Sequence, residues 1–202
     1  MKVLVTGGLG FIGSNFIIKL LKREDVSIVN IDAELYGSDH RNLSEIDNSD
    51  RYDFVKGNIS NKKFMEEQIG KCDLVVNFAA ESHVDRSIND ANPFLVSNIR
   101  GAFTILDIIT KQKKRMVQIS TDEVFGSLDE GTANEQSRFN PSSPYAATKA
   151  AAELLMNSYS VTFDSDIIIT RCTNNYGPRQ FVEKLIPKTI ILANKNLKIP
   201  IY

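Results

Sequence analysis

The fold is decided by Thr6-Gly7-Gly8-Leu9-Gly10-Phe11-Ile12-Gly13, a glycine-rich turn that joins an apolar segment at residues 1–5 to a helical pattern at residues 11–21. Glycines at 7, 10 and 13 permit a tight turn, close approach of the backbone to a pyrophosphate, and close packing of the helix on the strand. The helix N-terminus adds N–H donors and the positive end of the helix dipole. A strand, this turn and a helix in that order predict a dinucleotide-binding βαβ unit.

Asp32 supports the same interpretation. It follows a second apolar segment at residues 26–31, about 20 positions after the last glycine of the turn. A carboxylate at this place accepts hydrogen bonds from the adenosine ribose hydroxyls and repels a 2′-phosphate, so the sequence favours NAD over NADP. The simpler alternative is that Asp32 only caps a turn.

Strand-like and helix-like segments alternate along the rest of the chain. Apolar runs at residues 52–55, 73–78, 116–119 and 166–170 are typical of strands, whereas helical patterns start near 61, at 93 and at 141. The second of these helices is expected to reach about residue 113 and the third about residue 163. We expect seven strands in all, in an α/β fold: a Rossmann-like doubly wound parallel sheet with helices on both faces.

The alternation weakens after residue 174. One helix is expected at residues 183–194, followed by a short apolar segment at 199–202. We therefore expect an NAD-binding Rossmann domain at residues 1–175. Residues 176–202 would begin a small substrate-binding domain that looks incomplete.

Composition narrows the class of protein. A chain of 202 residues with 42% hydrophobic content can bury a core, and a net charge of −1 gives no basic field for nucleic acid. Cys72 and Cys172 form neither a CxxC pair nor a disulfide framework, and we expect both to be buried thiols in a reducing compartment. With only His40 and His83 beside them, no metal site is predicted. Without a signal peptide or membrane span in the sequence, the expected location is cytoplasmic, with no membrane partner.

Two further segments carry acid–base chemistry. Tyr145 and Lys149 lie one helical turn apart, so an ammonium can stabilise a phenolate and lower the pKa of the phenol. The stretch Ser120-Thr121-Asp122-Glu123 places two carboxyls after a strand, and a site can hold one neutral and one ionised. Taken alone, a Tyr and a Lys at this spacing are common in ordinary helices, and an Asp-Glu pair is usually a solvated turn.

Several motifs together resemble those of a known family, the extended short-chain dehydrogenase/reductases, and within it the dTDP-glucose 4,6-dehydratases. The glycine turn and Tyr-x-x-x-Lys are common to the whole superfamily, whereas Thr-Asp-Glu after the strand is narrower. The resemblance covers essentially the whole chain and is carried by the glycine turn together with Ala79-Ala80-Glu81-Ser82-His83-Val84-Asp85-Arg86-Ser87, Ser120-Thr121-Asp122-Glu123-Val124-Phe125-Gly126, Pro141-x-Ser143-Pro144-Tyr145-x-x-x-Lys149 and Asn174-Asn175-Tyr176-Gly177-Pro178.

The resemblance implies a role for each catalytic residue. Tyr145 would take the proton of the sugar 4-hydroxyl while hydride passes from C4 to NAD, and Lys149 would hold the nicotinamide ribose and tune Tyr145. Glu123 would then remove the C5 proton, and Asp122 would protonate the departing C6 hydroxyl. Thr121 would hydrogen-bond the sugar near its 4-hydroxyl. Hydride finally returns to C6, so the cofactor ends as it began.

The resemblance also implies two sets of binding residues. The NAD set, to which Tyr145 and Lys149 also belong, is Gly7, Gly10, Phe11, Ile12, Gly13, Asp32, Ala33, Glu34, Leu35, Asn58, Ile59, Phe78, Ala79, Ala80, Glu81, Ser82, Ser97 and Asn175. The substrate set is Ser82, Thr121, Asn174, Lys184, Leu185, Pro187, Pro200, Ile201 and Tyr202.

The leading hypothesis is therefore an NAD-dependent dehydratase acting on a nucleotide-diphosphate sugar, with dTDP-glucose as the expected substrate and a homodimer as the expected assembly. Two alternatives remain open at this point. A nucleotide-sugar 4-epimerase or decarboxylase of the same fold would oxidise C4 without using Asp122 and Glu123, and a non-catalytic NAD-binding regulatory protein would use neither pair. The sequence also leaves open whether the nucleotide base is thymine or uracil.

Overall fold

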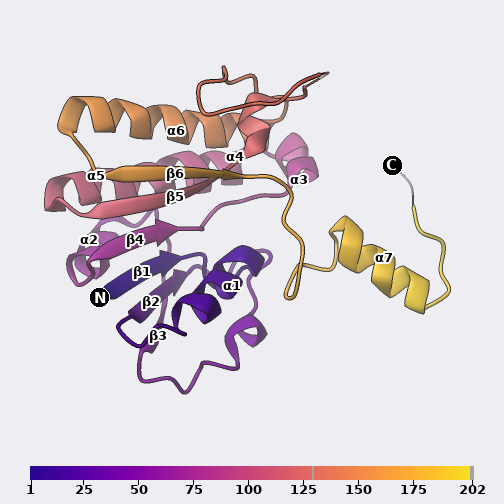
Figure 1. The fold of residues 1–202 in the computed structure, drawn as a ribbon, viewed down its shortest axis with the longest axis horizontal. Coiled ribbons are helices and arrows are strands. Elements are labelled where there is room, and N and C mark those ends of the chain that lie inside the picture. Colours follow the sequence, from indigo (N-terminus) through magenta and orange to yellow (C-terminus); the bar gives the residue numbers. More distant parts are fainter. Residues whose placement is uncertain (129, 201–202) are drawn as a thin grey trace.

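The computed structural model describes residues 1–128 and 130–200, and it shows one parallel sheet covered by helices (Figure 1). Six strands lie in the order β3-β2-β1-β4-β5-β6, which is the classic doubly wound order. The Rossmann-like fold class is thereby confirmed. The strands are β1 Lys2–Thr6, β2 Ser27–Asp32, β3 Tyr52–Lys56, β4 Leu74–Asn77, β5 Arg115–Thr121 and β6 Ile167–Cys172.

Helices cover both faces of this sheet. α1 packs on one face, and α2, α5 and α6 lie side by side on the other (Figure 1). The helices are α1 Phe11–Leu20, α2 Lys62–Gly70, α3 Val84–Asn89, α4 Asn92–Phe94, a π-helical segment η2 Leu95–Gly101, α5 Ala102–Gln112, α6 Pro144–Phe163 and α7 Leu185–Asn194. Two short 3₁₀ helices, η1 His40–Leu43 and η3 Asp122–Phe125, complete the set for the described residues.

The expectations differ from the structure in three places. The described residues form six strands rather than seven, because the apolar segment near residue 199 is not in a strand, and its last two residues, Ile201 and Tyr202, lie outside the described part. The helix expected from 93 to 113 is interrupted by η2, where buried Asn98 bonds to other segments of the chain. Helix α3 carries no strong apolar period and was not expected.

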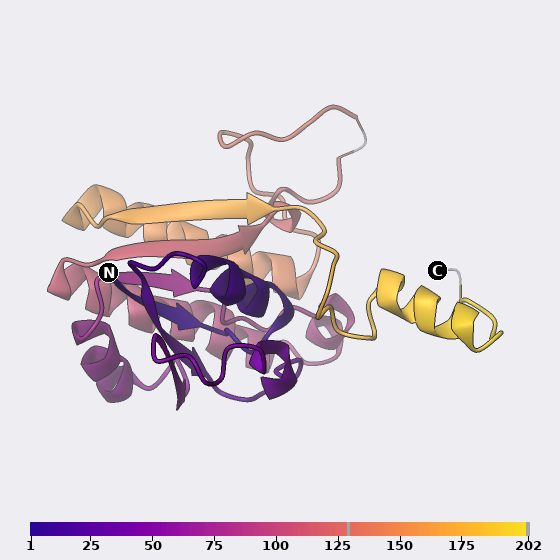
Figure 2. The same ribbon diagram turned by 60° about the horizontal axis from the view of Figure 1, so that its bottom comes forward.

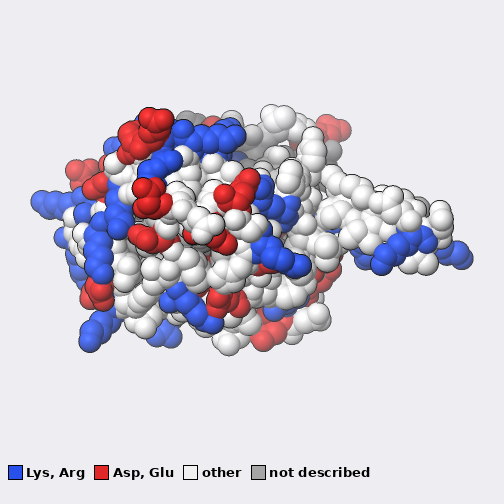
Figure 3. All heavy atoms as spheres, turned by 90° about the horizontal axis from the view of Figure 1, so that it is seen from below, with Lys and Arg blue, Asp and Glu red and all other residues white. Residues whose placement is uncertain are grey.

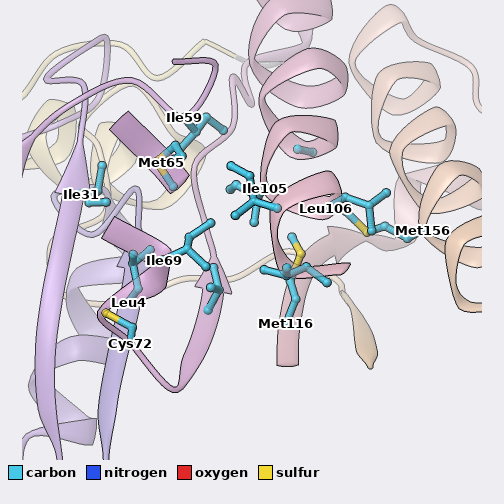
Figure 4. Close-up of a cluster of buried hydrophobic side chains, with 14 of the residues drawn as sticks. Leu4, Ile31, Ile59, Met65, Ile69, Cys72, Ile105, Leu106, Met116 and Met156 are labelled. Carbon is cyan, nitrogen blue, oxygen red and sulfur yellow. The ribbon is translucent and has the colours of Figure 1, made fainter. Parts of the chain in front are cut away.

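Two apolar cores sit on the two faces of the sheet because side chains alternate along each strand. Leu4, Ile105 and Met116 belong to the core under α2, α5 and α6, part of which Figure 4 shows. Val3 and Ile17 belong to the core under α1. Each fully buried aliphatic side chain of this kind contributes about 1.5–3 kcal/mol of burial free energy.

A buried polar row crosses the centre of the sheet close to the carboxyl ends of its strands. Thr6, Asn77 and Gln118 lie opposite one another on β1, β4 and β5. The Thr6 hydroxyl donates to the Asn77 amide oxygen at 2.5 Å, and the Asn77 amide nitrogen donates to the Gln118 amide oxygen at 2.7 Å. These bonds satisfy side chains that would otherwise be costly to bury beside the loops that bind ligands in this fold.

After β6 the chain crosses the mouth of the sheet and then leaves the body of the domain as α7 (Figures 1 and 2). No residue of α7 is buried. In the view of Figure 3, basic and acidic side chains are interspersed over the body, and the α7 segment shows mostly uncharged surface with a few basic groups. Within residues 1–128 and 130–200, no helix combines the length and apolar character needed to cross a bilayer.

Candidate active site

Helix α6 places Tyr145 and Lys149 at the carboxyl ends of β5 and β6. The Ser143 hydroxyl caps the helix by accepting from the backbone N–H of Ala146 at 3.1 Å, and Pro144 occupies the first turn, where its missing N–H costs nothing. The backbone N–H of Tyr145 donates to the Ser87 hydroxyl at 3.1 Å. This start fixes the Tyr145 side chain in the first turn and Lys149 in the next, both of them buried.

The Lys149 ammonium lies against the sheet rather than in solvent. Its Nζ donates to the backbone carbonyl of Ile119 at 2.6 Å. Burial lowers the pKa of Lys149 to about 8, although the nearby carboxylate of Glu153 acts in the opposite direction. The ammonium is therefore held at a cost in desolvation, which is typical of a functional rather than a structural lysine.

Tyr145 does not have the lowered pKa that its spacing from Lys149 predicts. Burial raises the pKa of the phenol, and the negative charge of Glu123 raises it further, while a hydrogen bond with Thr121 partly opposes the rise. The difference arises because the Lys149 ammonium bonds to the carbonyl of Ile119 instead of the phenol. The side chains alone thus hold Tyr145 as a neutral phenol.

The two adjacent carboxyls follow β5 in the 3₁₀ helix η3. The Thr121 hydroxyl caps this turn by accepting from the backbone N–H of Glu123 at 3.3 Å. Burial raises the pKa of Glu123, and the neighbouring charge of Asp122 adds to the rise. A higher pKa makes Glu123 a stronger proton acceptor once it is ionised.

One cleft of about 540 Å³ brings most of the expected residues together. From the acid–base set, Thr121, Glu123, Tyr145 and Lys149 line it. The expected binding residues that line it are Gly7, Gly10, Phe11, Ile12, Gly13, Asp32, Ala33, Leu35, Asn58, Ile59, Phe78, Ala79, Ala80, Glu81, Ser82, Ser97, Asn174, Asn175 and Lys184. Those that do not line it are Asp122, Glu34, Leu185, Pro187 and Pro200, while Ile201 and Tyr202 lie outside the described residues.

The glycine turn in this cleft leaves no room for side chains. A Cβ on Gly7, where φ is +70°, would lie 2.6 Å from the backbone nitrogen of Ala79, and one on Gly13 would lie 2.4 Å from the carbonyl oxygen of Gly7. Gly10, the N-cap of α1, offers no side chain to bond the first helical N–H groups. The start of α1 thus keeps the donors that suit a pyrophosphate.

Asp32 is anchored at the end of β2. Its two oxygens accept from the backbone N–H groups of Leu9 at 3.0 Å and Glu34 at 2.9 Å, and from the Ser38 hydroxyl at 2.8 Å. Oδ1 accepts the bonds from Glu34 and Ser38, whereas Oδ2 accepts only the bond from Leu9 and keeps a lone pair for a ribose hydroxyl. Glu34 instead pairs with Lys56 and with His40, the latter at 2.6 Å.

Residues 178–184, which we call the strap, run across the cleft and tie it to the α1 side of the domain. Arg179 donates to the carbonyl of Asn42 at 2.9 Å and to Glu45 at 2.5 Å. Glu183 accepts a hydrogen bond from the Tyr36 hydroxyl and lies 3.2 Å from Nε2 of His83. Sequence reasoning missed these pairs because the partners are far apart in the chain and share no local pattern.

Two other cleft residues differ from expectation. Cys172, expected to be a buried thiol like Cys72, is only partly buried and lines the cleft, because it ends the edge strand β6 opposite Thr121. His83, which belongs to neither of the two expected binding sets, also lines the cleft. The spacing of His83 after a strand end was the signal that could have placed it there.

The buried ammonium gives a stability prediction for Lys149→Met. The folded pKa of about 8 lies below the ordinary value of 10.5, so the desolvation cost is present in full below pH 8 and vanishes above about pH 10.5. We expect the variant to gain about 1–3 kcal/mol at pH 7, after the lost hydrogen bond to Ile119 is subtracted. Urea unfolding at pH 7 and pH 10.5 measures the gain, and exposed Lys22→Met is the control. A variant no more stable than the parent at pH 7 would contradict this account.

The fold and the site define a Rossmann-fold protein of the short-chain dehydrogenase/reductase class. A family model described as GDP-mannose 4,6 dehydratase matches residues 4–202, and the chain belongs to that family. The low-salt glycan biosynthesis protein Agl12 of Haloferax volcanii is 46% identical over 203 residues, which cover 100% of this chain and 66% of the relative. A dTDP-glucose 4,6-dehydratase of an Actinoplanes species is 42% identical, with 100% and 65% covered.

The chain is also similar in structure to solved nucleotide-sugar enzymes. The dTDP-glucose 4,6-dehydratase DesIV of Streptomyces venezuelae, with NAD and TYD bound, matches with a TM-score of 0.96 and 41% identity, over 100% of this chain and 65% of that one. A UDP-glucuronic acid 4-epimerase of Bacillus cereus, with UDP-glucuronic acid and NAD, matches with a TM-score of 0.94 and 29% identity, over 100% and 66%. The chain thus spans slightly less than two thirds of the length of these relatives.

Proposed function

We propose that the protein is an NAD-dependent nucleotide-sugar 4,6-dehydratase that converts dTDP-glucose to dTDP-4-keto-6-deoxyglucose and water. One observation carries the proposal: the Asp122–Glu123 turn adjoins the cleft into which Tyr145 and Lys149 project, close enough for Glu123 to raise the pKa of Tyr145. An alcohol oxidation needs only the Tyr and the Lys. The added carboxyls suit an elimination.

The cleft fits NAD at its α1 end. The crowded glycine turn and the N–H groups at the start of α1 match a pyrophosphate, and the remaining lone pair of Asp32 Oδ2 matches a ribose hydroxyl. Two dTDP-glucose 4,6-dehydratase structures among those that match this chain contain NAD. When bound, NAD would accept a hydride from the sugar and return it later in the same turnover.

Each proton has a residue to take or give it. As a phenolate, which the positive charge of bound NAD would favour, Tyr145 would accept the proton of the 4-hydroxyl while the C4 hydride passes to NAD, and a 4-ketone forms. The ketone acidifies C5, Glu123 takes the C5 proton, and Asp122 gives a proton to the C6 hydroxyl, which departs as water. The hydride and a proton then add back across C6 and C5, so the net change is the loss of one water.

Residues at the other end of the cleft suit the nucleotide-diphosphate sugar. Thr121, Ser82 and Asn174 line the cleft with groups that hydrogen-bond hydroxyls. Lys184 also lines the cleft, and its positive charge opposes part of the rise in the pKa of Glu123. An ammonium at this place can pair with the diphosphate of the substrate. The remaining substrate candidates, Leu185, Pro187 and Pro200, belong to the α7 segment, which has no buried residues in the described part.

The test is product analysis with the full-length gene product. We expect incubation with dTDP-glucose to give a sugar nucleotide lighter by one water, with UDP-glucose and GDP-mannose converted more slowly. Formation of a C4 epimer of unchanged mass would support the epimerase alternative instead. No change in any of the three sugars would refute the dehydratase.

We also propose a cytoplasmic homodimer that packs through η2, α5 and α6. Neighbouring helices there expose Leu95, Phe103, Leu154 and Val161, and Val161 is 89% exposed. An apolar surface that spans two helices is typical of a two-fold interface. Two free cysteines agree with a reducing compartment. A monomer mass by light scattering at micromolar concentration would contradict the dimer.

A further inference from the structure

A buried ion pair lies behind the acid–base residues and has no part in the chemistry proposed above. Glu153 lies one helical turn beyond Lys149 on α6 and is fully buried. Nε and Nη2 of Arg171, on β6, both donate to the same Glu153 oxygen, at 2.9 and 2.6 Å. The other oxygen, Oε1, has no hydrogen-bond partner among the described residues. Removing two charged groups from water costs free energy, so a buried ion pair need not make the folded protein more stable. Its presence instead favours a specific role for these two residues.

Arg171 joins this carboxylate to the segment that carries the two catalytic carboxyls. Its guanidinium lies 5.1 Å from the ring centre of Phe125 and 5.4 Å from that of Phe139. Phe125 is the last residue of the η3 turn and packs in a small core with Val124 and Ala150 of α6. Arg171 therefore bridges the catalytic helix and the acid–base turn through one rigid, planar group.

The strand register places this bridge next to the reacting groups. Arg171 pairs with Ser120, and the next residue of β6 pairs with Thr121. Ile119, whose carbonyl holds the Lys149 ammonium, precedes Ser120 on β5. A shift of Arg171 would thus move the turn and the lysine acceptor relative to α6.

We propose that Glu153 and Arg171 are a positioning pair that fixes α6 against the Asp122–Glu123 turn. The Glu153 carboxylate also favours the charged form of Lys149, because it opposes part of the decrease in pKa that burial causes. This inference rests on the proposed dehydratase function only for its kinetic consequence. The titratable groups that face Lys149 are Glu153 on its own helix and Cys172 on β6, and those that face Tyr145 are Glu123, Asp122 and Cys172.

The kinetic test uses Arg171→Lys in the full-length protein. Lysine keeps the positive charge but lacks the two N–H donors that bond Glu153 and the planar guanidinium that packs on Phe125 and Phe139. We expect kcat to fall about 10- to 100-fold with KM changed less than about threefold, as for a catalytic group misplaced by about 1 Å.

Reduced cofactor should accumulate during turnover of the variant. Tyr145 and Lys149 on α6 would still oxidise the sugar, whereas the displaced Asp122–Glu123 turn would eliminate water more slowly. Arg115→Lys is the control, since Arg115 pairs with Asp166 at the opposite, exposed ends of the same two strands.

A second test needs no substrate. Glu153→Gln removes the charge that favours the Lys149 ammonium, so the Lys149 pKa measured by NMR titration should fall by about half a unit or more. Arg171→Lys lets the turn move away, so the Tyr145 pKa should fall because Glu123 then affects it less. Lys149→Met and Tyr145→Phe identify the signals.

The two tests separate the possible failures. If the parent converts no sugar but both titrations shift, the proposed function fails and the positioning pair stands. If Arg171→Lys and Glu153→Gln only lower the melting temperature, with both titrations and the progress curve unchanged, the pair is structural and this inference is wrong.

Discussion

Tyr145→Phe is expected to lower the rate of C4 oxidation by about 10³-fold, a loss of about 4 kcal/mol of transition-state stabilisation. The phenol hydroxyl is the group placed to accept the 4-hydroxyl proton. Burial and the charge of Glu123 raise the pKa of Tyr145, so the protein side chains alone favour its neutral form, and the proton acceptor would be the phenolate that a bound cationic nicotinamide favours. The decisive measurement is the rate of cofactor reduction in a single turnover with the nucleotide sugar.

The same substitution should leave the fold and cofactor binding nearly unchanged. The Tyr145 ring packs edge-on against Phe94 with centroids 6.3 Å apart, and phenylalanine keeps that contact. Tyr159→Phe on the same helix is the matched control, because its ring packs edge-on against Phe103 and at a tilt against Phe163, and it does not line the cleft. A Tyr145→Phe enzyme within threefold of the parent rate would contradict the assignment of this residue as the base.

Glu123→Gln is expected to stop the reaction after its first step. Glutamine matches the shape of glutamate but cannot take the C5 proton, so water formation should fall about 10³-fold. Oxidation at C4 should continue, and the reduced cofactor should accumulate to nearly one equivalent per site. The acid limb of the rate profile, which the raised pKa of Glu123 shifts to higher pH, should disappear because that limb reports ionisation of the base.

This variant also separates a dehydratase from the epimerases that share the fold. An epimerase makes no use of a base at C5, so Glu123→Gln would leave its turnover intact. Glu135→Gln, on the exposed segment before α6, controls for the charge change. Normal water loss in Glu123→Gln would refute the role of Glu123 and weaken the dehydratase assignment with it.

The sequence predicts the parts of the site that depend on local spacing. Gly13 could be placed at the pyrophosphate turn because its contacts lie within the motif, whereas the crowding at Gly7 comes from the backbone of Ala79, which follows β4. Tyr145 and Lys149 share a helix face, and Asp32 ends a strand, so pattern alone brings them to one edge of the sheet. These are features of short-range geometry.

The rest depends on contacts that no local pattern encodes. The strap is held by pairs such as Tyr36 with Glu183 and Arg179 with Glu45, whose partners meet only when the whole domain has folded. The raised pKa of Tyr145 depends on where the Lys149 ammonium finds its acceptor, which the i,i+4 spacing does not fix. Within the π-helical turn, the side-chain amide of Asn98 bonds both backbone groups of Glu81, a loop residue from another part of the fold.

The polar row of Thr6, Asn77 and Gln118 bears on how the chain avoids misfolding. The strands around it consist largely of valine, isoleucine and leucine, which would pack almost equally well if β4 slid along β1. Such a slide would break both side-chain hydrogen bonds of the row, at about 1–3 kcal/mol for each buried group left without a partner. The row therefore favours the native register over a misaligned one by several kcal/mol, and it makes the alignment of β1, β4 and β5 depend on polar as well as apolar side chains.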